Sequence, residues 1–96
     1  MSREEIYAEC KLEKHEIKRI VQEMKQESNI VKVILSALIS CEGMADWLIL
    51  STQKERPTYE RIEFTQLGII PYGRTDFYAM RRKFYYTYKQ LKEKQC

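Results

Sequence analysis

Basic and aromatic side chains gather in the last quarter of the chain. Between Arg74 and Lys94 there are seven basic residues and two acidic ones, whereas the whole chain of 96 residues has a net charge of +3. The remainder of the chain is therefore slightly acidic. Arginine and lysine bind phosphates, and tyrosine adds hydrogen-bonding and stacking groups, so this segment predicts binding to a nucleic acid.

No recognisable set of catalytic residues accompanies this segment. The one histidine, His15, lies among charged neighbours, and the chain has no glycine-rich phosphate loop. Cys10, Cys41 and Cys96 are far apart and include no Cys-x-x-Cys pair. We therefore predict that the protein is not an enzyme, has no catalytic residues, no metal site and no cofactor, and keeps its thiols free in a reducing cytosol.

Helical periodicity runs along nearly the whole chain, which holds only three glycines and two prolines. It predicts one all-α domain over residues 1–96, a small bundle of about five helices. A first helix is expected from a Ser2–Glu5 capping box to about Glu27. The apolar residues at 30–39 have few polar gaps, so they predict a central core helix from Ile30, covered on most sides and ended by Gly43.

The second half of the chain is predicted to hold three more helical elements. A short helix is expected over 44–51, followed by a polar turn at 54–57 and a helix from 57 to about 67, ended by Gly68. A connector at 69–73 leads to a final helix that starts near Arg74. Its buried stripe is expected to consist of Phe77, Met80, Phe84, Tyr88 and Leu91.

A short helix, a turn with glycine and a basic second helix are typical of a helix-turn-helix, here a divergent one over 57–94 with a long connector. The second helix of that motif enters the major groove and reads base edges with its N-terminal half. The base-reading candidates are Arg74, Thr75, Tyr78, Ala79 and Arg82. The phosphate-binding candidates are Thr58, Arg61, Lys83, Tyr86, Lys89, Lys92 and Lys94.

The segments Arg56–Glu60, Gly68–Tyr78 and Arg81–Phe84 also resemble part of a known family. They are similar to the C-terminal part of small helix-turn-helix proteins from phages and prophages of Gram-positive bacteria, the ArpU-like and RinA-like late transcription regulators. The resemblance covers about 40 residues. It implies a fold like that of sigma factor region 4, a recognition helix opening at Arg74 and a role in transcription regulation through duplex DNA.

Two function classes stay open. One is a sequence-specific duplex-DNA-binding regulator; the other is a small protein-interaction module that modifies a host protein such as RNA polymerase, using Tyr78, Tyr85 and Tyr86. Residues 1–52 are expected to form the core and to favour a symmetric homodimer. The apolar stripe for that contact consists of Ile6, Cys10, Ile17, Val21 and Met24. The charged N-terminus and the lack of a long apolar segment predict a cytoplasmic protein without membrane contact.

Overall fold

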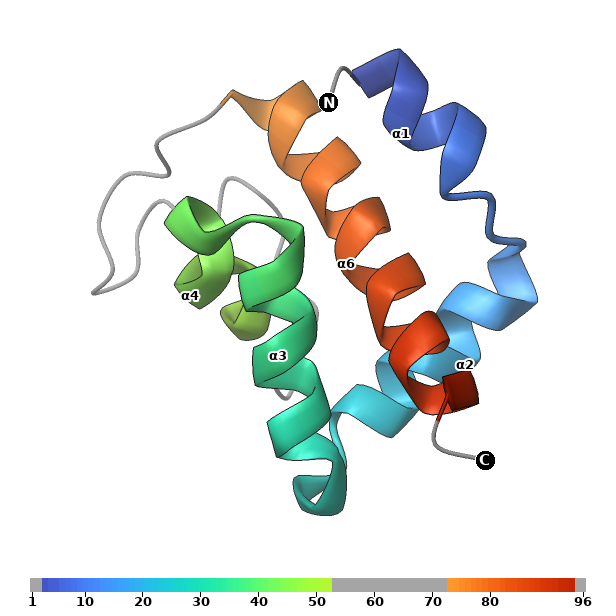
Figure 1. Cartoon of the computed structure of the whole chain (residues 1–96), viewed down its shortest axis with the longest axis vertical. Coiled ribbons are helices and arrows are strands. Elements are labelled where there is room, and N and C mark those ends of the chain that lie inside the picture. The colour runs from blue at the N-terminus through green and yellow to red at the C-terminus, as the bar shows by residue number, and fades with distance from the viewer. Residues whose placement is uncertain (1–2, 53–72, 95–96) are drawn as a thin grey trace.

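One long helix, α6, organises the fold, and the shorter helices pack around it (Figure 1). The computed structural model describes residues 3–52 and 73–94, which contain five α-helices, two 3-10 turns and no strand. The α-helices are α1 (Arg3–Glu9), α2 (Lys14–Met24), α3 (Ile30–Ser40), α4 (Ala45–Leu50) and α6 (Arg74–Lys94). The 3-10 turns are η1 (Glu27–Asn29) and η2 (Glu42–Met44). The predicted all-α fold is confirmed.

Several predicted features lie outside the described residues. These are Ser2, the turn at 54–57, the helix from 57 to 67, Gly68 and most of the connector at 69–73. The helix-turn-helix therefore stays a prediction. Among the helices that are described, none combines the length and the apolar character needed to cross a membrane.

The N-terminal segment forms two helices, whereas the sequence predicted one. Helix α1 ends at Glu9, and α2 begins at Lys14 after a turn in which the Glu13 backbone N–H donates to the Glu16 carboxylate, 3.2 Å away. The Arg82 guanidinium donates to the carbonyl oxygen of Cys10 at 3.2 Å. Both interactions satisfy backbone groups in the break, so the chain can turn there without leaving polar groups unpaired.

Helix α6 begins at Arg74, as predicted, and lies between α1 and α2 on one side and α3 and α4 on the other (Figure 1). Phe77, Phe84 and Tyr88 of the predicted stripe are buried, while Met80 and Leu91 are half-buried. Burial continues beyond that stripe. Ala79, Tyr85 and Thr87 are also buried, because neighbouring helices cover α6 on several sides. The central core helix is therefore α6.

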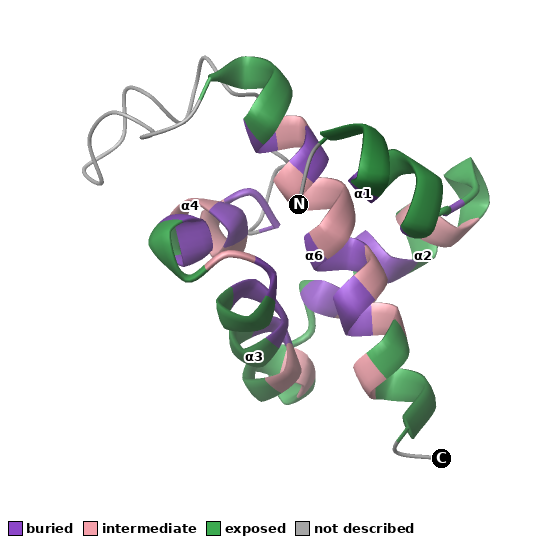
Figure 2. Cartoon of the chain, turned by 45° about the horizontal axis from the view of Figure 1, so that its top comes forward, coloured by how far each residue is buried: buried purple, intermediate pink, exposed green. Residues whose placement is uncertain are grey.

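Helix α3 differs from the prediction of a helix covered on most sides. It starts at Ile30, as predicted, but its buried residues are the small ones. They are Val33, Ser36, Ala37 and Ser40, which share one face by their three- and four-residue spacing. The larger aliphatic residues lie on the opposite, exposed face, seen as the green side of α3 in Figure 2.

Small side chains bring α3 and α6 close together. The Ser40 and Thr87 hydroxyl oxygens form a hydrogen bond of 3.2 Å between the two helices. Within each helix, the Ser40 hydroxyl also contacts the Ser36 carbonyl at 2.7 Å, and the Thr87 hydroxyl contacts the Lys83 carbonyl at 2.8 Å. Buried hydroxyl groups are thus satisfied at the contact, and the aromatic residues of α6 fill the remaining space.

The core has two parts. The larger joins α2, α3, α4 and α6 and includes Met24, Leu48, Phe77, Phe84 and Tyr88. The smaller lies between α1 and α6, where Ile6, Cys10 and Ala79 are buried together. The predicted short helix near 44–51 is present as α4, which adds Leu48 to the larger part. Helix α1 therefore packs against α6 through a small hydrophobic cluster that is separate from the larger core.

Candidate protein-interaction surface

The base-reading candidates do not share one open surface. Arg74 and Thr75 are exposed in the first turn of α6, and Tyr78 is half-buried. Ala79 is 0 % exposed and packs against Ile6 and Cys10 of the α1 segment. The base-reading candidate Ala79 is therefore covered by the α1 segment in this structure.

Arg82 holds the turn that follows α1. Its Nη1 atom donates to the carbonyl oxygens of Cys10 at 3.2 Å and Leu12 at 3.4 Å. Its guanidinium also lies over the Tyr7 ring, 5.3 Å from the ring centroid. A charged donor on two backbone carbonyls is a strong anchor for a chain turn. In this arrangement the guanidinium of Arg82 is directed at the protein itself.

Two of the phosphate candidates bind carboxylates of α2. Lys89 lies 2.6 Å from the Glu16 carboxylate, and Lys92 forms an ion pair with Glu23. The hydrogen bond from Lys89 lowers the pKa of Glu16, and the same bond raises the pKa of Lys89. Lys83 and Tyr86 are half-buried, and Thr58 and Arg61 lie outside the described residues. The positive charge concentrated in the C-terminal segment is thus partly neutralised by α2.

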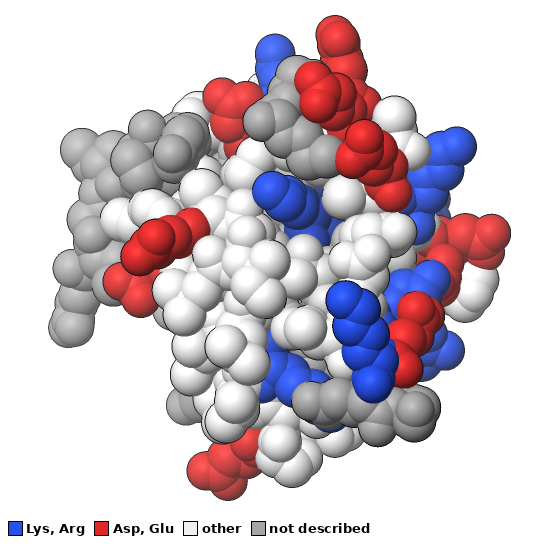
Figure 3. Space-filling view, in the orientation of Figure 1, with Lys and Arg blue, Asp and Glu red and all other residues white. Residues whose placement is uncertain are grey.

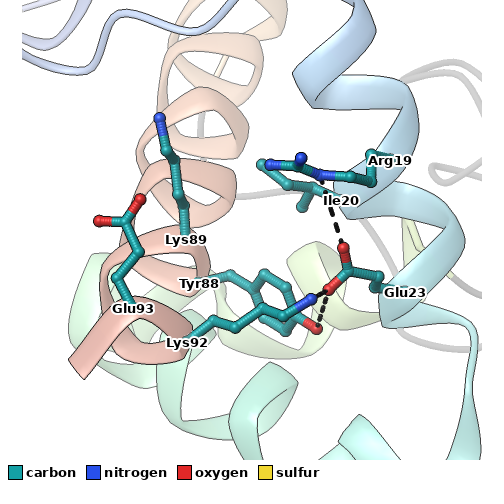
Figure 4. A pocket seen from close by; sticks show the side chains of 7 residues that line it. All are labelled: Arg19, Ile20, Glu23, Tyr88, Lys89, Lys92 and Glu93. Atoms are coloured by element: carbon teal, nitrogen blue, oxygen red, sulfur yellow. Dashed lines mark hydrogen bonds and ion pairs between the residues drawn. The ribbon is translucent and has the colours of Figure 1, made fainter. Parts of the chain in front are cut away.

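The carboxylate of Glu23 is the centre of a charged pocket of about 250 Å³ between α2 and α6 (Figure 4). It accepts hydrogen bonds from Lys92 and from the Tyr88 hydroxyl at 3.4 Å, and it forms an ion pair with Arg19 at 3.7 Å. Glu93 and Lys89 complete the charged lining. The lining holds three cations, Arg19, Lys89 and Lys92, and two carboxylates, Glu23 and Glu93, so most of its charge is paired within the protein and the pocket joins α2 to α6.

A second pocket, of about 230 Å³, lies where α1, α2 and α6 meet. Its rim carries Arg81, which lies 4.7 Å from the Tyr78 ring centroid and 6.0 Å from that of Tyr85. Cation–π contacts of this kind fix both the arginine and the rings. Within residues 3–52 and 73–94, no three His, Cys, Asp or Glu side chains come together as a candidate metal site.

The outer face of α3 carries most of the large hydrophobic side chains that are exposed in the described residues. Six aliphatic side chains on it are between 38 and 65 % exposed. They are Ile30, Val31, Ile34, Leu35, Leu38 and Ile39, and we call them the α3 face. In Figure 3 the surface over α3 is mostly white, with the charged side chains mainly around it. A contiguous apolar patch of this kind is typical of a protein–protein interaction site.

The stripe that favoured a dimer in the sequence is not available for one. Ile6, Cys10, Val21 and Met24 are buried inside the chain, and Ile17 is half-buried against the core. The α3 face was missed because a run of apolar residues looks like a helix covered on all sides. Ser36 and Ser40 give the signal that could have found it, since hydroxyl and small residues at helical spacing mark the face with the closest helix neighbour.

Comparison with known proteins gives no relative. No protein-family profile matches the chain, and neither a curated protein nor a solved structure matches it.

Proposed function

We propose that this protein is a protein-interaction module that binds through the α3 face. One observation carries the proposal: α3 packs its small side chains against α6 and leaves its large aliphatic ones in water. Placing the small residues inward and the large ones outward reverses the usual order of an amphipathic helix. The arrangement is understandable if a protein surface covers the outer face in the functional state.

The composition of the face suits a helical or flat apolar protein surface. Lys32, the one charged residue of α3, is half-buried and lies off the exposed rows. An aliphatic partner can therefore be bound without burying a charge from this face. Binding of this type is dominated by a few central side chains. Leu35 and Leu38, near the middle of the face, are the expected centre.

Selection of amphipathic helical peptides tests this function. The full chain is immobilised at low density, so that its copies stay apart, and peptides are selected in parallel on the wild type and on Leu35→Glu. The matched control is Gln22→Glu, which adds the same charge at an exposed position of α2. Peptides should bind the wild type and the control and lose binding to Leu35→Glu. Equal peptide recovery from all three would count against a role of the α3 face in peptide binding.

Duplex-DNA binding is the second candidate, and a specific observation favours it. Arg74 and Thr75 are exposed in the first turn of α6, where a helix N-terminus and an arginine suit a phosphate or a base edge. The resemblance of the C-terminal segment to phage transcription regulators supports the same role. In this alternative, contact is made by the start of α6 and by the half-buried Lys83, while Arg82 keeps α1 in place.

Salt dependence of duplex-DNA binding tests this alternative. With Arg74, Lys83 and Lys94 as phosphate contacts, the log–log slope of affinity against salt is about −3, compared with −4 to −5 for five contacts. Arg74→Ala should weaken binding, whereas Lys14→Ala, an exposed lysine of α2, should not. No retention of random-sequence duplex DNA at low salt would exclude the DNA alternative.

A further inference from the structure

Resting on the proposed function, we propose that the partner of the α3 face is a second copy of this chain. The two α3 helices would pack across a two-fold axis as an antiparallel pair. The observation behind this is the layout of the exposed side chains, which form two parallel rows with four-residue spacing. One row is Ile30, Ile34 and Leu38, and the other is Val31, Leu35 and Ile39.

Rows of this spacing are self-complementary. In the commonest class of helix packing, such ridges of one helix fit the grooves of the other at a crossing angle of about −50°. When two copies of α3 run antiparallel, Ile34 of one copy faces Leu35 of the other, and Val31 faces Leu38. Each row therefore meets the opposite row of the second copy, as a two-fold contact requires.

The size of the face agrees with a dimer. Six aliphatic residues that are on average about half exposed present an apolar patch on the order of several hundred Å², comparable with the roughly 300–600 Å² of the largest patch on a typical monomer. Two such patches approach the about 1,200 Å² at which stable, specific interfaces begin. The pair would thus bury apolar surface close to the lower limit of a stable, specific dimer.

The lack of charge on the α3 face also agrees with contact between two copies of it. A two-fold axis brings each charge close to its own copy, so a charged surface repels itself unless the signs alternate. None of the six residues of the α3 face is charged. The ion pairs that use Glu16 and Glu23 lie between α2 and α6, and the Glu23 pair lies in the separate pocket of Figure 4.

Sedimentation equilibrium of the full chain tests the dimer between about 1 and 500 µM. The wild type should show a monomer–dimer equilibrium. Leu35→Glu places two carboxylates at the axis and should weaken association by about 100-fold or more, whereas Gln22→Glu should leave it unchanged. Circular dichroism checks the fold of each variant. Should Leu35→Glu not fold, Val31→Glu replaces it, because Val31 is the most exposed residue of the face.

A charge pair makes the geometry itself testable. Ile34→Lys alone should also be monomeric, because it places a lysine in the same apolar contact. Mixing Ile34→Lys with Leu35→Glu should restore association, since lysine of one chain then faces glutamate of the other. If Ile34→Lys and Leu35→Glu do not associate with each other when they are mixed, the antiparallel pairing is overturned.

The remaining outcomes separate this inference from the proposed function. A wild type that stays monomeric throughout overturns the dimer, and peptides that still require Leu35 would then support a different protein as the partner. A dimer that survives both Leu35→Glu and Ile34→Lys places the interface elsewhere and also overturns the inference. A monomer that binds no selected peptide contradicts both proposals.

Discussion

The role predicted for Arg82 from the sequence differs from the contacts that it makes in the structure. On the sequence it belongs to a basic cluster; in the fold its guanidinium binds the carbonyl oxygens of Cys10 and Leu12 and covers the Tyr7 ring. Those carbonyls belong to the turn between α1 and α2. The residue therefore connects two elements that are some 70 positions away from it in the chain.

Replacing Arg82 should consequently lower stability. Arg82→Ala leaves two backbone carbonyls without their charged donor, and the free energy of unfolding should fall by about 1–3 kcal/mol. Urea denaturation measures the change. Lys83→Ala removes the same charge one position further on and serves as the control, with an expected change within about 0.5 kcal/mol. Equal losses for the two variants would argue against the role of Arg82 in the turn.

The Glu16–Lys89 pair predicts a pH dependence. The pKa of Glu16 is lowered from its ordinary 4.5, so its contribution to stability is present above that value and is lost as the pH falls through the lowered pKa. The pKa of Lys89 is raised from 10.5, so its contribution is present below that value and is lost as the pH rises through the raised pKa. The pair therefore stabilises the fold between these limits.

Urea denaturation of the wild type and Lys89→Ala at pH 7 and at about pH 3 checks this window. The wild type should be more stable than the variant at pH 7, and the difference should shrink at the lower pH as Glu16 is protonated. Lys94→Ala, at the exposed end of α6, controls for the loss of a lysine. A difference that is the same at both values would show that Lys89 stabilises by packing alone.

At the scale of elements, the small face of α3 controls how closely it approaches α6. Ala37 is 0 % exposed and shares the buried face of α3 with Ser40, whose hydroxyl bonds Thr87 of α6. Ala37→Leu should push the two helices apart and lower the free energy of unfolding by about 1–3 kcal/mol. Ala8→Leu makes the same substitution on the exposed side of α1 and should change stability little. Thermal unfolding followed by circular dichroism compares them.

Helical periodicity predicted where helices form but not which side of each meets its neighbours. The starts of α3 and α6 and the position of α4 agree with the sequence, because the helices expected from Ile30, over 44–51 and from near Arg74 lie close to the observed ones. The break between α1 and α2 combines a local contact between Glu13 and Glu16 with hydrogen bonds from Arg82, far along the chain, and only the local contact could have been found in the sequence. The local and the tertiary contact together overrode the continuous helical period there.

The candidate site was harder to predict for a related reason. Charge density along the chain located the basic segment correctly, but Glu16 and Glu23 of α2 lie beside Lys89 and Lys92 only once the helices pack. Likewise, the apolar richness of α3 was visible, whereas its exposure depends on which face α6 covers. Sequence thus supplied the residue types, and packing decided which remain accessible.

For the whole molecule, the proposed self-association through the α3 face would link stability to protein concentration. A dimer that binds only folded chains stabilises them by mass action, so the melting temperature should rise as the wild type is concentrated. Leu35→Glu should melt at a temperature that does not depend on concentration. Differential scanning calorimetry over a hundredfold range of concentration makes the comparison. An unchanged wild-type melting temperature would contradict a folded dimer in that range.

The separate attachment of α1 has a kinetic consequence. Burial raises the pKa of the Cys10 thiol and shields it from reagents, so alkylation of Cys10 requires α1 to detach from α6. Under conditions where reclosing is fast, the labelling rate reports the free energy of that opening, independently of global unfolding. A ligand that binds the surface of Ala79 must compete with α1 and will accelerate the alkylation of Cys10. A ligand that binds the α3 face leaves the rate of Cys10 alkylation unchanged.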